Sequence, residues 1–178
     1  MTQTGLFCFD DVRDGIAARR VVRRMPVVSG GAIRIQRVEG LRDGRGEVHA
    51  GAFLRERRIT LSCTRAEFPR IFAHEAAHFV WVRLGNQRRR SWEAVLKRET
   101  GAGELGWSAE WRKAALDASD GARRTRRWRE YCCEAFCDTA AWLWSGHGRH
   151  AEFTLAGRER LRRRRWFAIN VWGRTLSI

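Results

Sequence analysis

Residues 71–81 read IFAHEAAHFVW and carry the most informative pattern in the chain. His74 and His78 are four residues apart, which places both imidazoles on one face of a helix. Apart from Glu75, the other residues of the segment are uncharged. Since an unpaired charge is costly to bury, this composition predicts a buried helix whose histidines face a cleft.

The spacing of His74, Glu75 and His78 also points to a chemistry. Neutral imidazole is a good zinc ligand, and two histidines one helical turn apart can reach the same ion. Glu75 stands beside them, where its carboxylate can polarise a water molecule in the site. A catalytic zinc site has three protein ligands and one open position, so we predict bound Zn²⁺ and a third ligand elsewhere in the chain.

This H-E-x-x-H segment resembles the zincin class of metallopeptidases. The resemblance implies that an edge strand before the metal helix holds an extended peptide, and Arg58–Cys63 stands at the corresponding place. The metzincin form of the class has Gly and His three and six residues after the second histidine. Trp81 and Leu84 occupy those positions in this chain.

The downstream segment Glu134-Ala135-Phe136-Cys137-Asp138 resembles the E-x-x-x-D motif of the gluzincins. Similarity to that group implies that Glu134 is the third zinc ligand. It also implies that Asp138 accepts a hydrogen bond from a ligand histidine, His74, and fixes its tautomer.

Two alternatives to Glu134 remain open. Glu130 lies one helical turn earlier and is the main competitor for the third ligand. Cys133 and Cys137 are four residues apart and could offer a soft metal site, although core packing is the usual role of such cysteines.

The resemblance further implies zinc-dependent hydrolysis of a peptide or protein substrate, by an endopeptidase rather than an exopeptidase. Glu75 would act as general base and pass the proton of water to the leaving amine. Family members use a Tyr or His beyond the ligand helix to stabilise the oxyanion. The candidates here are Tyr131, His147 and His150, each of which also fits a purely structural role.

The residues before the H-E-x-x-H segment predict strands. Gly31–Val38 alternates apolar and polar residues, and Glu47–Phe53 is its expected partner across the turn signal Asp43–Gly46. Arg58–Cys63 alternates in the same way. We therefore predict a small N-terminal antiparallel sheet within a β-rich part of about residues 20–63.

From residue 64 to about residue 170 the pattern is helical. Thr64-x-x-Glu67 has the form of a capping box, so we expect the metal helix to begin there and to end near Gly85. The other expected helices begin at Ser91 and at Ser108, or cover Arg123–Ser145 and Leu155–Ile169, with a loop at Gly101–Gly106. Strands followed by helices favour the α+β class, in a single domain over residues 1–178.

The chain is strongly basic, since 35 Lys+Arg face 20 Asp+Glu and give a net charge of +15. Its arginines gather in Arg123–Arg129 and Arg158–Arg165, and such a charge attracts phosphates. A basic nucleic-acid-binding protein with an incidental H-E-x-x-H is therefore the alternative function. A SprT-like DNA-associated protease would combine both functions. However, the histidine that such proteins carry in a short H-G segment has no counterpart at Gly106-Trp107.

Composition excludes several classes of protein. An apolar fraction of 44% with nine Trp and nine Phe excludes a wholly disordered chain. No apolar run approaches the roughly 18 residues of a membrane span, and the first 14 residues do not have the pattern of an export signal. Five cysteines, an odd number, are then expected to be reduced thiols in the cytoplasm.

Overall fold

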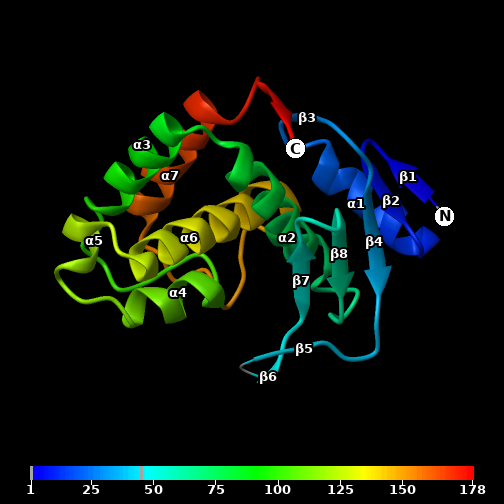
Figure 1. Cartoon of the computed structure of the whole chain (residues 1–178), viewed down its shortest axis with the longest axis horizontal. Helices are drawn as coiled ribbons and strands as arrows, with labels where there is room; N and C mark the ends of the chain where they lie inside the picture. Colours follow the sequence, from blue (N-terminus) through cyan, green and yellow to red (C-terminus); the bar gives the residue numbers. More distant parts are fainter. Residues whose placement is uncertain (1, 45) are drawn as a thin grey trace.

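Strands and one helix form the first third of the chain, and helices form most of the rest. The structure is a computed structural model that describes residues 2–44 and 46–178 (Figure 1). The strands are β1 (Thr2–Thr4), β2 (Phe7–Phe9), β3 (Val27–Ser29), β4 (Ile33–Arg37), β5 (Arg42–Asp43), β6 (Gly46–Glu47), β7 (Ala50–Phe53), β8 (Arg58–Leu61) and β9 (Thr175–Ser177). The helices are α1 (Val12–Val22), α2 (Phe68–Arg83), α3 (Asn86–Leu96), α4 (Trp107–Ala114), α5 (Asp120–Arg123), α6 (Arg126–Ser145) and α7 (Gly157–Asn170). The α+β class is confirmed.

The main sheet has the order β1-β2-β4-β8-β7 and is mixed, so the prediction of an antiparallel sheet was wrong. β2, β4 and β8 run parallel, and β1 and β7 are antiparallel to their neighbours at the two edges. Parallel neighbours need a crossover connection, which α1 provides between β2 and β4. The alternation of apolar and polar residues shows that one face of a strand is buried. It does not show in which direction the neighbouring strand runs.

The expected hairpin between Gly31–Val38 and Glu47–Phe53 does not form. β7 instead pairs with β8 through a four-residue turn in which Arg57 adopts a left-handed φ of 49°. The turn at Asp43 closes only the short ribbon of β5 and β6. Because β8 is covered on both sides by β4 and β7, the edge strand beside the helical half is β7, not the predicted Arg58–Cys63.

Helix α2 packs its apolar face on the inner face of this sheet. Phe72 makes edge-to-face contacts with Phe7 and Phe9, at ring-centroid distances of 5.1 and 5.4 Å. At the start of the helix, Thr64 Oγ1 accepts a hydrogen bond from the Glu67 N–H at 3.3 Å, as a capping side chain does, although the helix proper begins at Phe68. This packing leaves the opposite face of α2, with both histidines, toward α6.

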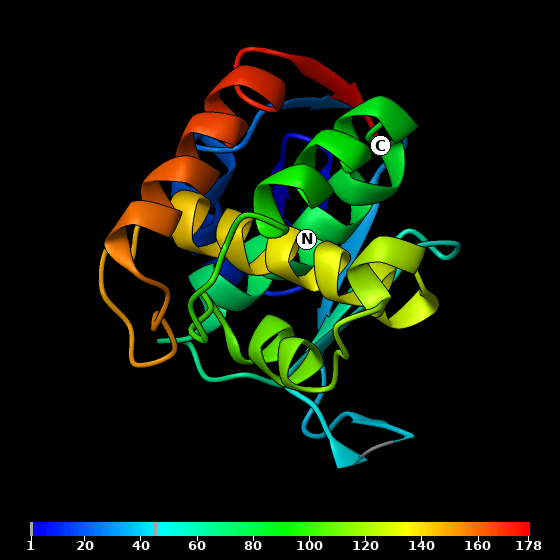
Figure 2. The same cartoon turned by 90° about the vertical axis from the view of Figure 1, so that its left-hand side faces the viewer.

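Helix α6 crosses the middle of the helical half, with α3, α4 and α7 around it (Figure 2). It begins at Arg126 rather than Arg123, because Arg124 is left-handed with a φ of 51° and separates the short α5. Thr125 caps its first turn by accepting from the Trp128 N–H at 3.3 Å. The predicted end at Gly146 is confirmed, where a φ of 84° ends the helix.

The remaining helices differ from prediction at their starts. α3 begins at Asn86, five residues before the expected Ser91 cap. α4 begins at Trp107, with Gly106 rather than Ser108 as its N-cap residue. The last helix, α7, is shifted by one to two residues from Leu155–Ile169. The expected loop at Gly101–Gly106 contains neither helix nor strand.

Among the described residues, no helix is both long enough and apolar enough to cross a membrane. The five cysteines are free thiols.

Candidate metal centre

The two histidines of α2 meet a carboxylate of α6. Glu134 Oε2 lies 3.3 Å from His74 Nε2 and 3.9 Å from His78 Nε2. The two imidazole rings are 5.1 Å apart between centroids. All three side chains are mostly buried, with 12–19% of each exposed. Residues 56 to 60 positions apart in the sequence thus converge where the two helices pack.

The outer nitrogen of each imidazole is also engaged. His74 Nδ1 lies 2.8 Å from Asp138 Oδ1, so the hydrogen bond expected between these two residues is present. His78 Nδ1 lies 3.5 Å from Cys133 Sγ. These contacts leave both Nε2 atoms toward Glu134. Partners on the far nitrogen orient metal-binding histidines in this way.

Asp138 also fixes a third element at the site. Its second oxygen, Oδ2, accepts a hydrogen bond from the Ala109 N–H, in the first turn of α4, at 2.9 Å. A carboxylate is favourable at this position because the N–H groups of a helix N-terminus are unpaired and carry partial positive charge. Asp138 therefore connects His74 to the start of α4.

Sequence reasoning missed the role of Gly106, which precedes α4. A Cβ at this position would lie 2.3–2.6 Å from the carboxylate atoms of Asp138, closer than non-bonded atoms approach. Any side chain here would push α4 away from α6. No local pattern marks this glycine, because its constraint comes from a residue 32 positions later.

Arg112 of α4 was missed as well. Its Nη2 lies 3.3 Å from Glu134 Oε1, whereas the other carboxylate oxygen, Oε2, is the one close to the two histidines. Burial alone would raise the pKa of Glu134, but His74, His78 and Arg112 outweigh it and lower the pKa to about 2. Glu134 is therefore an anion throughout the physiological pH range, with Oε2 directed at the imidazoles.

Glu75 has a different environment from Glu134. It is buried, and burial raises its pKa although the neighbouring histidines act in the opposite direction. A raised pKa makes the carboxylate a better proton acceptor, which is what a general base requires.

The protonation of the histidines couples the site to pH. Burial lowers the pKa of His74, but Asp138 and Glu134 outweigh it and raise the pKa well above its ordinary value. The pKa of His78 rises to about 9, since Cys133 and Glu134 also outweigh burial there. Because metal ligands must be unprotonated, an ion would have to displace these protons on binding.

The distances from Glu134 to the two histidines are compatible with a zinc ion. With ligand bonds of about 2.0–2.2 Å, two ligand atoms of a tetrahedral zinc lie about 3.4 Å apart. The distances of 3.3 and 3.9 Å from Glu134 Oε2 to the two Nε2 atoms are close to this value. The partial exposure of His74, His78 and Glu134 is consistent with an open fourth position.

A second ligand set shares the same histidines. Ligand atoms of His74, His78 and Cys137 all lie within 4.8 Å of one another. Cys137 is fully buried, and burial together with its contact to Cys133 raises the pKa of its thiol. We favour Glu134, because it is already an anion and partly accessible, whereas Cys137 would first have to lose a proton in the core.

The structure places the other predicted residues away from this point. Glu130, the competitor of Glu134, pairs with Arg126 at 2.7 Å on the exposed side of α6. Tyr131 donates to Glu104 Oε1 at 2.6 Å within the core. His150 contacts Glu67 Oε1 at 3.3 Å, before the start of α2.

His147, the last oxyanion candidate, lies beyond the far end of α6. Ser145 is about 16 Å from Glu134 along the helix axis, and His147 follows it. No predicted oxyanion donor therefore contacts the histidines or Glu134. The cationic side chain that does contact the site is Arg112.

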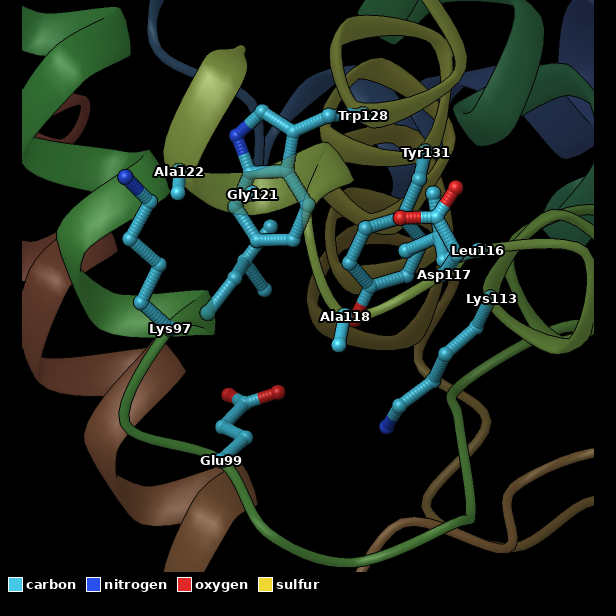
Figure 3. Close-up of a pocket in the computed structure, with 11 residues that line it drawn as sticks. Lys97, Glu99, Lys113, Leu116, Asp117, Ala118, Gly121, Ala122, Trp128 and Tyr131 are labelled. Atoms are coloured by element: carbon cyan, nitrogen blue, oxygen red, sulfur yellow. The ribbon is translucent and has the colours of Figure 1, made fainter. Parts of the chain in front are cut away.

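The helical half also contains a cavity of about 440 Å³, which Figure 3 shows between α3, α4, α5 and α6. Its walls include Lys97, Lys113, Leu116, Trp128 and Tyr131. None of His74, His78 and Glu134 lines it.

Comparison with protein-family models, with curated proteins and with solved structures finds no match to this chain. Its function must therefore be inferred from the residues of the site.

Proposed function

We propose that the chain is a zinc-dependent endopeptidase in which His74, His78 and Glu134 hold the ion. The supporting observation is the approach of Glu134 Oε2 to both Nε2 atoms, while Asp138 and Cys133 engage the two Nδ1 atoms. A pair of histidines without such a function would not need a buried carboxylate on one side and ordered partners on the other.

Each residue of the site has a task in this proposal. When bound, zinc supplies a Lewis acid that polarises the scissile carbonyl and lowers the pKa of water. Glu75 takes up the proton released from water and passes it to the leaving amine. Arg112 holds Glu134 Oε1 and helps to keep this ligand an anion, because it lowers the pKa of the carboxyl group.

The substrate is a peptide in extended conformation. β7 is at the edge of the sheet, without a further strand partner among the described residues, and α2 packs beside it. The backbone groups of such an edge can pair with an added strand. The five free thiols suit a reducing compartment, so we place the activity in the cytoplasm.

The test compares zinc content with turnover in three purified variants. Glu75→Gln is expected to keep about one zinc per chain and to lose cleavage of an unstructured protein substrate. His78→Ala is expected to lose the zinc as well. Glu130→Gln, in an exposed ion pair with Arg126, serves as the matched control and should keep both.

Two results would contradict the proposal. One is normal cleavage by Glu75→Gln, which would remove the general base from the mechanism. The other is a wild-type chain that binds no zinc when it is refolded or dialysed against the ion.

A further inference from the structure

A second hollow lies at the C-terminal end of α6. It has a volume of about 490 Å³, within the usual range of small-ligand pockets. It forms where the end of α6, helix α7 and the residue segments after α1 and α7 meet. Its walls include Arg24, Trp142, Gly146, His147, Arg164 and Trp172.

The charge of this hollow is positive and uncompensated. No acidic residue is among the described residues that line it. The Arg164 guanidinium has no ion pair or hydrogen bond within the described chain, and the Arg24 guanidinium donates only to the Arg20 carbonyl, at 3.0 Å. Both side chains are exposed, so their guanidinium groups are accessible to a bound anion.

Neighbouring arginines of α7 have other roles. Arg163 is fully buried and pairs with Glu99 and Glu104, and Arg162 pairs with Glu159. The basic run at Arg158–Arg165 is therefore not one uniform surface. Arg164 is the member of the run that faces the hollow.

Two tryptophans supply aromatic walls. The other partly or fully buried tryptophans, such as Trp92 and Trp166, make ring contacts with aromatic neighbours in the core. Trp142 and Trp172 are half-buried, and neither makes a stacked or edge-to-face ring contact among the residues that the structure describes, although Trp142 packs against the cluster of Leu105, Phe153 and Leu155. Indole faces beside guanidinium groups are the combination on which nucleobases stack and phosphates bind.

Local backbone geometry shapes the hollow around Arg24. Gly146 has a φ of 84°, and a Cβ there would lie 3.1 Å from the Arg24 guanidinium. The glycine thus lets Arg24 approach the end of α6. Beside it, His147 Nδ1 is buried and has no hydrogen-bond partner in the described chain, so a ligand hydroxyl or phosphate could pair with it.

We propose that this hollow binds a nucleotide unit, with the phosphate on Arg164 and Arg24 and the base against the tryptophans. The unit is either a free nucleotide or part of a single-stranded nucleic acid. The inference does not depend on the metal centre, since none of the lining residues belongs to it.

Binding is tested on the full chain with four probes. They are thymidine monophosphate, a fluorescein-labelled thymidine oligonucleotide, a duplex of the same length, and inorganic phosphate. Tighter binding of the oligonucleotide than of the mononucleotide identifies a single strand as the source, and equal binding identifies the free nucleotide. Tighter binding of the duplex, or equal competition by inorganic phosphate, overturns the proposal.

Matched substitutions locate the binding. Arg164→Gln is expected to weaken oligonucleotide binding about tenfold and to reduce the salt slope by about 0.7, the value for one phosphate contact on a single strand. Arg165→Gln removes the same charge from the next residue of α7, which does not line the hollow, and should change neither. Equal effects of the two variants would show general attraction to a basic surface and overturn the proposal.

A second pair tests the aromatic wall. Trp172→Leu is expected to weaken binding about tenfold through lost stacking. Trp107→Leu, at a tryptophan that is 69% exposed elsewhere, should leave binding unchanged. Circular dichroism shows whether each variant remains folded. Unchanged binding in a folded Trp172→Leu protein would also overturn the proposal.

Discussion

At the scale of single residues, the metal centre depends on which side chain supplies the third ligand atom. Glu134 and Cys137 lie one turn apart on α6 and both approach the histidines. Glu134→Gln keeps the volume of the side chain and removes its charge. We expect it to weaken zinc binding by more than about 100-fold, the upper range for loss of a contact outside the ligands themselves.

Cys137→Ala is the companion variant and is expected to keep the zinc affinity of the wild type. Competition with a chromogenic chelator measures both constants. Cobalt substitution adds an independent readout, because a cobalt–thiolate bond has a charge-transfer band that a carboxylate lacks. Loss of zinc in Cys137→Ala together with that band would assign the third ligand to Cys137.

Asp138 acts on the site through His74 rather than by touching an ion. Asp138 has an oxygen for each of its two partners, His74 Nδ1 and the Ala109 N–H. An asparagine has only one side-chain oxygen and no negative charge, so it cannot accept both hydrogen bonds. Asp138→Asn should therefore lower zinc affinity about 10- to 100-fold. Asp10→Asn, in an exposed ion pair with Arg34, is the control and should leave affinity unchanged. Equal affinities in the two variants would refute this role of Asp138.

These residues mark the limit of prediction from sequence. His74, Glu75 and His78 are four residues or fewer apart, so the helical period relates them directly. Glu134 and Asp138 share the same spacing on a second helix, and a motif could suggest them. Arg112 and Gly106 belong to no motif, since their positions matter only after α4 has packed on α6.

At the scale of elements, the contact of α4 with α6 holds the site together. Gly106→Ala places a methyl group against the Asp138 carboxylate and must displace α4. We expect a loss of about 1–3 kcal/mol in the free energy of unfolding, as in overpacked cores. A loss of zinc affinity should accompany it, because Asp138 would move relative to His74.

Gly101→Ala is the matched control, because nothing lies within 4 Å of a Cβ at that position. Denaturant unfolding with and without zinc measures both effects. Equal stability of the two variants would show that α4 can shift without cost.

The sheet shows why element order was predicted more easily than element pairing. A strand alternates apolar and polar residues whether its neighbour is parallel or antiparallel, as at Ile33, Ile35, Ile59 and Leu61. The pattern therefore identifies strands but not their partners. The parallel pairing depends on β2, which has only three residues, and on α1, a helix that we did not predict. The helices α2 and α6 were predictable because the Thr64–Glu67 capping box, the H-E-x-x-H segment and Gly146 mark their positions.

At the scale of the whole molecule, a buried charge network connects α7, α6 and the loop before α4. Arg163 pairs with Glu99 at 2.6 Å and with Glu104 at 2.7 Å, and Tyr131 donates to Glu104 at 2.6 Å. Burial raises the pKa of Glu104, but Arg163 and Lys113 outweigh it and lower the pKa below its ordinary 4.5.

The sign of this shift predicts how acid acts on the fold. Because the folded pKa of Glu104 lies below the unfolded one, its contribution to stability is complete above about pH 4.5 and is lost as pH falls through the folded value. Glu104→Gln should cost about 3 kcal/mol at pH 7 and make stability less sensitive to acid. Urea unfolding between pH 3 and pH 7 measures both quantities.

Glu130→Gln removes an exposed partner of Arg126 and should cost less than about 1 kcal/mol. Two results would show that the buried network does not stabilise this part of the fold. One is an equal loss of stability in Glu104→Gln and Glu130→Gln, and the other is a wild-type acid dependence in Glu104→Gln.

The parallel pairing of β9 with β3 has a consequence for cooperativity. Thr175–Ser177 lies beside Val27–Ser29, and the Ile178 N–H donates to the Ser29 carbonyl at 2.8 Å. The chain therefore closes a loop that contains α2, α6 and every residue of the metal centre. Separating the helical half from the sheet would break this closure, so the two halves should melt together rather than as independent folding units.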